Sequence, residues 1–148
     1  EADRSTGSVT LGPGHLPVVT IDDVAASTTT VLDARAAERY RGDVEPVDPR
    51  AGHIPGAVSA PTTDNLDADG HFRPINQLRQ RFRGLGVASG GSEPIVYCGS
   101  GINAAHEIAA LAMLDIPAAL FPGSFSQWSS DPSRTVATVE GQGSSSIR

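Results

Sequence analysis

Lysine is absent from this sequence, and all eleven basic residues are arginines. This absence excludes Schiff-base chemistry at a lysine amine and phosphate binding by a P-loop lysine. An anion site in this chain must therefore use guanidinium groups, backbone N–H groups or the N-terminal ends of helices. The formal net charge of −6 at pH 7 also argues against nucleic acid as a partner.

Cysteine is nearly absent, because Cys98 is the only one. A single cysteine excludes an internal disulfide framework and a cysteine-rich zinc site. Since no two of the four histidines have the spacing of a metal site, we predict neither a metal nor a cofactor. No apolar run approaches the length of a membrane span, and the first residues lack the basic-then-apolar pattern of a signal peptide. We expect a cytoplasmic protein without a membrane partner, in a reducing setting where a thiol persists.

The 148 residues suffice for one domain with a sizeable core. Residues 1–17 carry several Gly, Pro and Ser and little periodicity, which is typical of an arm or linker. Residues 140–148, EGQGSSSIR, are predicted to be a flexible tail. The folded domain is therefore expected at residues 18–139.

Between these ends, strand-like and helix-like segments alternate. Helices are predicted after Thr20, before Gly42, from Pro74 to Gly84 or Gly86, over residues 103–114 and over residues 124–130. Strands are predicted over residues 29–34, 57–59, 94–98 and 118–121. The alternation predicts an α/β fold, with a central parallel sheet of about five strands and helices on both faces. Ligands bind at the carboxyl ends of the strands in such sheets, and Cys98 lies at one of these ends.

The segment around Cys98, VYCGSGINAA, predicts a tight loop between a buried strand and a helix. Its two glycines accept the φ values at which consecutive N–H groups point inward. The unpaired N–H groups and positive dipole end of the following helix face the same point, so a Cys98 thiolate is stabilised there. A lone cysteine is more often a small buried apolar residue. The strand end, the two glycines and the helix start together favour a nucleophile, and Ser100 adds a hydroxyl that can bond to a substrate.

Two kinds of cysteine chemistry fit such a loop. A cysteine phosphatase needs an arginine at the end of the loop to hold the phosphoryl oxygens, but Asn103 and Ala104 stand there. Phosphate monoester hydrolysis is therefore disfavoured, although phosphatase or arsenate reductase chemistry stays open as an alternative. A loop of uncharged backbone donors suits a smaller group, such as a sulfur atom carried on Cys98 as a persulfide.

Five segments resemble, in order and spacing, those of rhodanese-type sulfurtransferases. They are VLDAR, ERYRGDVEPVDPRAGHIPGAV, the strand into Cys98, the loop CGSGINAA and LFPGSFSQWSSDPSRTVAT. The resemblance covers nearly all of residues 18–139 and implies the rhodanese-like α/β fold. It is greatest to the C-terminal, catalytic half of tandem thiosulfate or 3-mercaptopyruvate sulfurtransferases, and residues 1–17 resemble the linker between the two halves.

The resemblance implies a ping-pong mechanism. Cys98 attacks the outer sulfur of thiosulfate or 3-mercaptopyruvate, keeps it as a persulfide and passes it to cyanide or a thiol. The backbone N–H groups from Gly99 to Asn103, with those of Gly101 and Ile102 among them, cradle this sulfur. Ile102 and Asn103 replace the family's usual Val-Thr pair.

The resemblance also assigns side chains to the donor. The family's pocket holds the donor's carboxylate with two arginines, which correspond here to Arg39 and Arg50, with Arg41 as the alternative to Arg50. Ser100 matches the serine that assists the chemistry. The uncharged loop leans toward 3-mercaptopyruvate, and the choice between that donor and thiosulfate stays open.

Other polar residues are predicted to serve the scaffold. Asp33 and Arg35 are expected to form a buried or half-buried ion pair that supports the site. His53, in the tight GHIPG turn, is expected to be a hydrogen-bonded scaffold residue rather than a base. Trp128 is predicted to lie in the core. The acidic loop DVEPVDPR, residues 43–50, is predicted to be a solvated rim.

A function of another class is also open. A rhodanese domain can be a non-catalytic binding or regulatory module, and its partner here would be the N-terminal rhodanese half that the resemblance implies. Transfer of sulfur from thiosulfate, and its loss in Cys98→Ser, distinguishes the two hypotheses.

Overall fold

A computed structural model describes residues 7–10, 12, 14 and 16–139 of the chain. The predicted arm at residues 1–17 lies mostly outside these residues, and the predicted tail at residues 140–148 lies entirely outside them. The described elements are α1 (Ile21–Ala26), β1 (Val31–Asp33), α2 (Ala37–Arg41), β2 (Val58–Ser59), the 3-10 helix η1 (Thr62–Asn65), α3 (Ile75–Gly84), β3 (Ile95–Tyr97), α4 (Ile102–Ala112), β4 (Ala119–Leu120) and α5 (Ser124–Ser130). Each expected helix and strand is present, with bounds that differ by a few residues.

The four strands form one parallel sheet in the order β2–β1–β3–β4. The expectation of about five strands is close to this number. Beyond β4, a single parallel bridge joins Val18 to Leu120 at the edge of the sheet. The amides of Val19 and Leu120 close it, each in a hydrogen bond of 2.9 Å to a carbonyl of the facing segment. A single bridged pair does not make a fifth strand, but Val18 lies where a fifth strand beside β4 would be.

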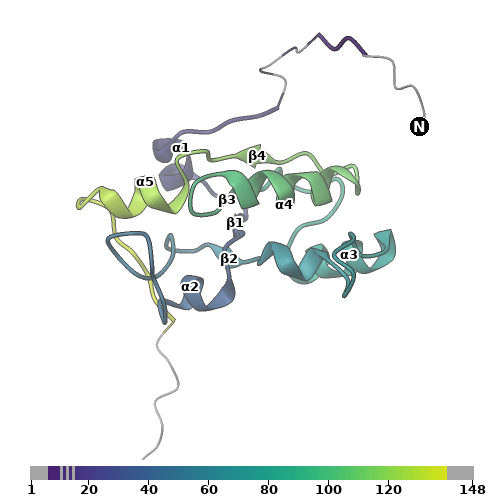
Figure 1. Cartoon of the computed structure of the whole chain (residues 1–148). Coiled ribbons are helices and arrows are strands. Elements are labelled where there is room, and N and C mark those ends of the chain that lie inside the picture. The colour runs from purple at the N-terminus through teal and green to yellow at the C-terminus, as the bar shows by residue number, and fades with distance from the viewer. Residues whose placement is uncertain (1–6, 11, 13, 15, 140–148) are drawn as a thin grey trace, which may run out of the picture.

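Helices cover both faces of the sheet, as the alternating pattern predicted (Figure 1). Successive side chains of a strand point to opposite faces. On one face, Leu32 of β1 and Val96 of β3 pack against Leu78 and Phe82 of α3 and Leu111 of α4. All five of these side chains are fully buried. This layer is the larger of the two cores.

The opposite face of the sheet is covered by the first and last helices. Val31 and Ile95 pack there against Val24 of α1 and against Phe125 and Trp128 of α5. Figure 1 shows α1 and α5 side by side, although they come from opposite ends of the domain. The predicted core position of Trp128 is confirmed, since 5% of this residue is exposed.

Local sequence explains where the helices begin and end. Thr20 and Asp23 form a capping box at the start of α1, in which each side chain accepts a hydrogen bond from the other residue's backbone N–H. Helix α2 ends at Gly42, whose φ of +89° suits a glycine better than any other residue. Among the residues that the structure describes, no helix combines the length and the apolar character needed to cross a membrane.

The sheet order reverses between its two central strands. The chain leaves β1, forms β2 on one side, and then crosses to the other side of β1 for β3 and β4. A crevice forms at such a reversal, outside the carboxyl ends of the strands. Asp33 ends β1 and Cys98 follows β3, so both residues lie at this crevice.

A substitution at Gly52 can test how closely the backbone is packed near this crevice. Its φ is +123°, and a Cβ there would lie 2.2 Å from the carbonyl oxygen of Ala137. We expect Gly52→Ala to lower the free energy of unfolding by more than about 2 kcal/mol, as measured by urea denaturation. Gly84→Ala, at the end of α3 with nothing within 4 Å of the new Cβ, is the matched control and should be neutral or stabilising. Equal effects of the two substitutions would contradict this account.

Candidate active site

The thiol of Cys98 lies at the end of β3, inside the loop that leads to α4. The residue is 3% exposed, and its Sγ accepts a hydrogen bond of 3.1 Å from the backbone N–H of Gly101. Gly101 is the residue before α4 and has a φ of +87°. A Cβ on Gly101 would lie 3.2 Å from the carbonyl oxygen of Pro122, so a side chain there is opposed by both conformation and space.

One N–H group of the predicted cradle contacts the thiol. Within the loop at residues 98–103, all of which the structure describes, the N–H of Gly101 is the donor that bonds to Sγ. The first-turn N–H groups of α4 have no partners within the helix, and they add the positive end of its dipole to the same region. This arrangement stabilises negative charge on the sulfur of Cys98.

Helix α5 holds the backbone of this loop from below. The carbonyls of Cys98 and Gly99 accept hydrogen bonds from the N–H groups of Phe125 and Ser126, at 2.9 and 3.1 Å. The N–H of Cys98 in turn donates to the hydroxyl of Ser124 at 3.1 Å. Ser124 is fully buried and has a φ of +53°, an uncommon conformation for a serine. The sequence predicts Ser124 only as part of a short helix, and no local pattern indicates its bond to the Cys98 loop.

A cavity of about 280 Å³ opens above the thiol. Its lining consists of Arg35, Ala36, Arg39, Cys98, Gly99, Ser100, Ile102 and Asn103. The fold therefore brings together Cys98, Ser100 and Arg39, which the sequence analysis assigned to the same site. Ile102 is 77% exposed at the rim. A cavity of this size suits a small molecule.

The predicted ion pair of Asp33 and Arg35 lies beneath this cavity, and both side chains are almost fully buried. Arg35 donates through Nη2 to Asp33 Oδ2 at 2.6 Å and to the carbonyl of Gly52, also at 2.6 Å. Its guanidinium carbon also lies 3.8 Å from the ring centroid of Phe125. The hydroxyl of Tyr97 donates to Asp33 at 2.7 Å. Burial first, and then the charge of Asp33, raises the pKa of Tyr97 well above its usual range, so this hydroxyl stays protonated.

The acidic loop at residues 43–50 is solvated over much of its length, as predicted, but two of its three carboxylates are not. The side chains of Glu45 and Asp48 are only 5% and 2% exposed, and both turn inward to Arg39. Arg39 Nη2 lies 2.6 Å from Glu45 Oε1 and 3.0 Å from Asp48 Oδ2. Asp43 fits the prediction, with a half-exposed side chain paired to Arg41, and Val44 and Val47 are exposed as well. The sequence offered no periodicity in this loop that could indicate which carboxylates turn inward.

Glu45 stays ionised in this setting. Burial by itself would raise the pKa of Glu45, but the hydrogen bonds from Arg39 and from the amides of Asp48 and Val47 outweigh it. The pKa of Glu45 therefore lies below its ordinary value.

Arg50 does not reach the cavity with Arg39. Its guanidinium donates to four backbone carbonyls at the end of α5 and just after it, at distances from 2.7 to 3.1 Å. These carbonyls belong to Trp128, Ser129, Asp131 and Arg134. Arg41, the alternative, pairs with the exposed Asp43 instead. Of the three arginines proposed for the donor, the structure brings Arg39 to Cys98.

His53 has the scaffold position expected from its turn. Its ring stacks on that of Tyr40 with 3.8 Å between the centroids, and Nδ1 lies 2.8 Å from the carbonyl oxygen of Tyr40. Its backbone forms an antiparallel bridge with Ala137. These contacts join the turn before β2 to Tyr40 in α2 and to the segment around Ala137.

Two further features lie away from Cys98. A cavity of about 400 Å³ lies between α1, α5 and the turn at residues 54–56. The cation on its wall, Arg134, is already paired with Asp22 and Asp131. The larger volume does not make it the better candidate, because no thiol lines it and its cation is already paired.

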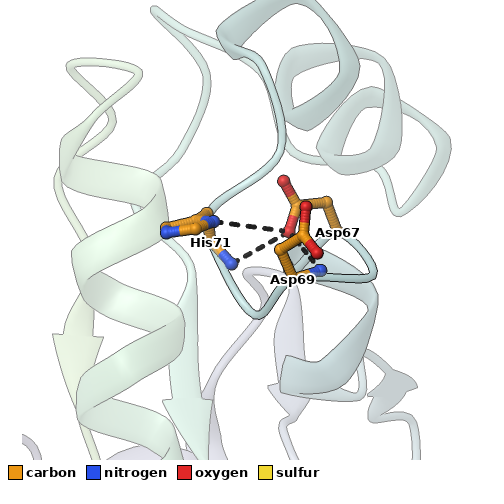
Figure 2. Close-up of side chains that lie close together, drawn as sticks. All are labelled: Asp67, Asp69 and His71. Atoms are coloured by element: carbon orange, nitrogen blue, oxygen red, sulfur yellow. Dashed lines mark hydrogen bonds and ion pairs between the residues drawn. The ribbon is translucent and has the colours of Figure 1, made fainter.

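The second feature is a cluster of Asp67, Asp69 and His71, in the loop between η1 and α3 (Figure 2). All three residues are exposed, and their ligand atoms lie within 4.8 Å of one another. Oδ1 of Asp67 accepts hydrogen bonds from the N–H groups of Asp69 and His71, at 3.0 and 2.9 Å. These bonds lower the pKa of Asp67, the one from His71 most. The three side chains lie close together because Asp67 bonds to the backbone of its own turn, so their proximity does not by itself indicate a metal site.

Comparison with known proteins places the chain in a family. The profile described as Rhodanese-like domain matches residues 20–131, so the chain belongs to the rhodanese-like domain family. The chain is 52% identical over 109 residues to the "Probable 3-mercaptopyruvate sulfurtransferase" of Pseudomonas aeruginosa, a match that covers 73% of this chain and 38% of that protein. It is 39% identical over 119 residues to the 3-mercaptopyruvate sulfurtransferase of Escherichia coli K12, covering 75% of this chain and 41% of the relative.

A relative named for the other donor also matches. The thiosulfate sulfurtransferase of Gallus gallus is 33% identical over 110 residues, covering 73% of this chain and 37% of that protein. The chain thus spans about two fifths of the length of these curated relatives. Among solved structures, EanB in complex with ergothioneine superimposes with a TM-score of 0.74 at 21% identity, over 82% of this chain and 32% of that one. This likeness confirms the fold.

The position of Arg50 leads to a prediction about stability. Arg50→Met removes the donor from four carbonyls at the end of α5 and should lower the free energy of unfolding by about 3 kcal/mol. Arg41→Met, which removes an exposed ion pair, should change it by less than about 0.5 kcal/mol. Both values can be measured by urea denaturation. A stable Arg50→Met protein would contradict the structural role of this residue.

Proposed function

We propose that this domain is a sulfurtransferase that carries a sulfane sulfur as a persulfide on Cys98. The observation that carries the proposal is the contact between Cys98 Sγ and the N–H of Gly101, in a loop that opens into a small cavity at the start of α4. The same environment that stabilises a thiolate stabilises the terminal sulfur of a persulfide. The names of the relatives support sulfur transfer in general.

In the first half-reaction the Cys98 thiolate attacks the outer sulfur of the donor. With thiosulfate, a new S–S bond forms to Cys98, the S–S bond of the donor breaks, and sulfite leaves with the electron pair. With 3-mercaptopyruvate, the C–S bond breaks instead and the leaving enolate of pyruvate takes up a proton. In both cases the enzyme is left with a persulfide anion on Cys98.

The second half-reaction restores the thiolate. Cyanide or a thiolate attacks the terminal sulfur, the S–S bond to Cys98 breaks, and thiocyanate or a new persulfide leaves. No redox partner is consumed in this cycle when cyanide is the acceptor. A reducing compartment such as the cytoplasm suits this chemistry, because the free thiolate must persist between turnovers.

Three side chains of the site have distinct proposed roles. Ser100 lies at the cavity wall, where its hydroxyl can donate to the donor or to the leaving enolate. Arg39 is on the same wall and offers its guanidinium to the donor's anionic group. Arg35 is held by Asp33 and supports the loop from below rather than binding the donor. No arginine ends the loop, which supports sulfur transfer over phosphoryl transfer.

The proposal predicts a covalent sulfur adduct. Incubation with thiosulfate or 3-mercaptopyruvate should raise the mass of the intact protein by one sulfur atom, about 32 Da, and cyanide should remove it. Cys98→Ser should show no adduct, and its fold can be checked by urea denaturation. Whichever donor gives the adduct is the donor that the domain uses.

No adduct with either donor would contradict catalysis by this domain. That outcome would favour a non-catalytic rhodanese module, or one that requires an N-terminal rhodanese half to complete its pocket.

The role of Arg39 predicts a change in donor binding. Arg39→Met should raise KM for the donor about tenfold or more, because one charge-assisted hydrogen bond is lost, and should leave KM for cyanide unchanged. Arg41→Met is the matched control, since Arg41 is on the same helix but pairs with the exposed Asp43. Steady-state kinetics with both donors measures this difference. Equal KM values in the two variants would argue against donor binding by Arg39.

A further inference from the structure

The guanidinium of Arg39 is bonded on one side only. Nη2 and Nε face the acidic loop, with Nε 3.4 Å from Glu45 Oε2 and Nη2 in the shorter bonds to Glu45 and Asp48. Within the part of the chain that the structure describes, Nη1 has no hydrogen-bond partner. A Cβ built on Gly99 would lie 3.6 Å from Nη1, so this free nitrogen faces the Cys98 loop.

The charges around this guanidinium are linked into one network. It holds two cations and three carboxylates: Arg35, Arg39, Asp33, Glu45 and Asp48. In the ionised form that these pairs require, the network has one more negative than positive charge. The three carboxylate side chains are at most 5% exposed, so water and salt screen them little. The two arginines therefore do not make the cavity electropositive.

This balance affects donors of different charge differently. Cys98 attacks as a thiolate, so the donor meets a negative charge on the sulfur during the reaction. A donor with two negative charges, such as thiosulfate, meets this charge with only the N-terminal end of α4, and no net positive charge on the side chains, to offset it. A donor with a single carboxylate, such as 3-mercaptopyruvate, meets half of that repulsion and can still bond to Arg39 Nη1.

We propose that Glu45 and Asp48 are specificity-determining residues, which compensate the charge of Arg39 so that the site selects a singly charged sulfur donor over a doubly charged one. This inference rests on the proposed function of Cys98 and goes further by assigning the donor class. Neither residue contacts the sulfur; both act through Arg39.

Glu45→Gln is a suitable probe, because it can remove the charge while keeping the shorter contacts. Oε1 of Glu45 accepts the bond from Arg39 Nη2 and the amides of Val47 and Asp48, at 2.6 to 3.1 Å. A glutamine oxygen can accept all three. Oε2 makes only the longer contacts, of 3.3 and 3.4 Å, to Arg35 and Arg39.

Asp48→Asn is the second probe, and it keeps the inference testable if the Glu45→Gln protein does not fold. Asp48 Oδ2 accepts from Arg39, and Oδ1 accepts from the hydroxyl of Ser126 at 2.5 Å. An asparagine can keep its oxygen toward Arg39 and donate its amide to Ser126, because a hydroxyl also accepts. Asp43→Asn is the matched control: it removes a charge from the same loop, but from a half-exposed carboxylate paired with Arg41.

The first measurement is the ratio of kcat/KM for thiosulfate to kcat/KM for 3-mercaptopyruvate. Glu45→Gln and Asp48→Asn should each raise this ratio about fivefold, and Asp43→Asn by less than about twofold. Arg39→Met should lower it. A ratio that stays unchanged or falls in both Glu45→Gln and Asp48→Asn would overturn the inference.

The second measurement does not require sulfur transfer. Alkylation of Cys98 by iodoacetate, an anion, is compared with alkylation by neutral iodoacetamide. The iodoacetate-to-iodoacetamide rate ratio should rise about fivefold in Glu45→Gln and Asp48→Asn and stay level in Asp43→Asn. A level ratio in all variants would overturn the inference whatever the donors show. A raised ratio in a protein that forms no persulfide would instead refute the proposed function and leave the charge compensation standing.

Discussion

The buried ion pair of Asp33 and Arg35 joins the segments that shape the active end of the sheet. Asp33 ends β1, Arg35 begins the turn into α2, and Tyr97 at the end of β3 donates to the same carboxylate. Arg35 also reaches the carbonyl of Gly52, which anchors the turn before β2. Removal of Arg35 would leave Asp33 buried without its cation, which is among the costlier changes a protein can suffer. Removal of Asp33 would leave Arg35 with only its longer carboxylate contact, to Glu45. The residue after Tyr97 is Cys98, so the position of the thiol depends on this pair.

The loop that holds the thiol is built from backbone rather than from charged side chains. Helix α5 occupies the carbonyls of Cys98 and Gly99 through its first N–H groups, and the N–H of Gly101 bonds to Sγ. Backbone dipoles that are fixed in place need no reorganisation when charge appears on the sulfur. In the proposed sulfur transfer the reacting sulfur is an anion both as the thiolate and as the persulfide, so a fixed cradle suits both states.

The positive charges of the arginines at the site are likewise compensated within the protein. Arg35 is held by Asp33, and Arg39 is held by Glu45 and Asp48, so each cation near the sulfur has a buried carboxylate beside it. A site with unpaired arginines would attract many anions. A compensated one can still offer a directed hydrogen bond while discriminating against multiply charged ligands.

The amino-acid sequence by itself determined the alternation of strands and helices, the helix ends at Thr20 and Gly42, and the loop around Cys98. These follow from near neighbours: capping side chains, glycine φ values and apolar periodicity act over a few residues. The tertiary structure alone decided that Arg50 turns to α5 and that Glu45 turns to Arg39. The carbonyls that Arg50 binds lie about 80 residues further along the chain. In a proline-rich loop without periodicity, no local pattern encodes the direction of a charged side chain. This holds for Arg50, whose partners are distant, and for Glu45, whose partner Arg39 is six residues earlier.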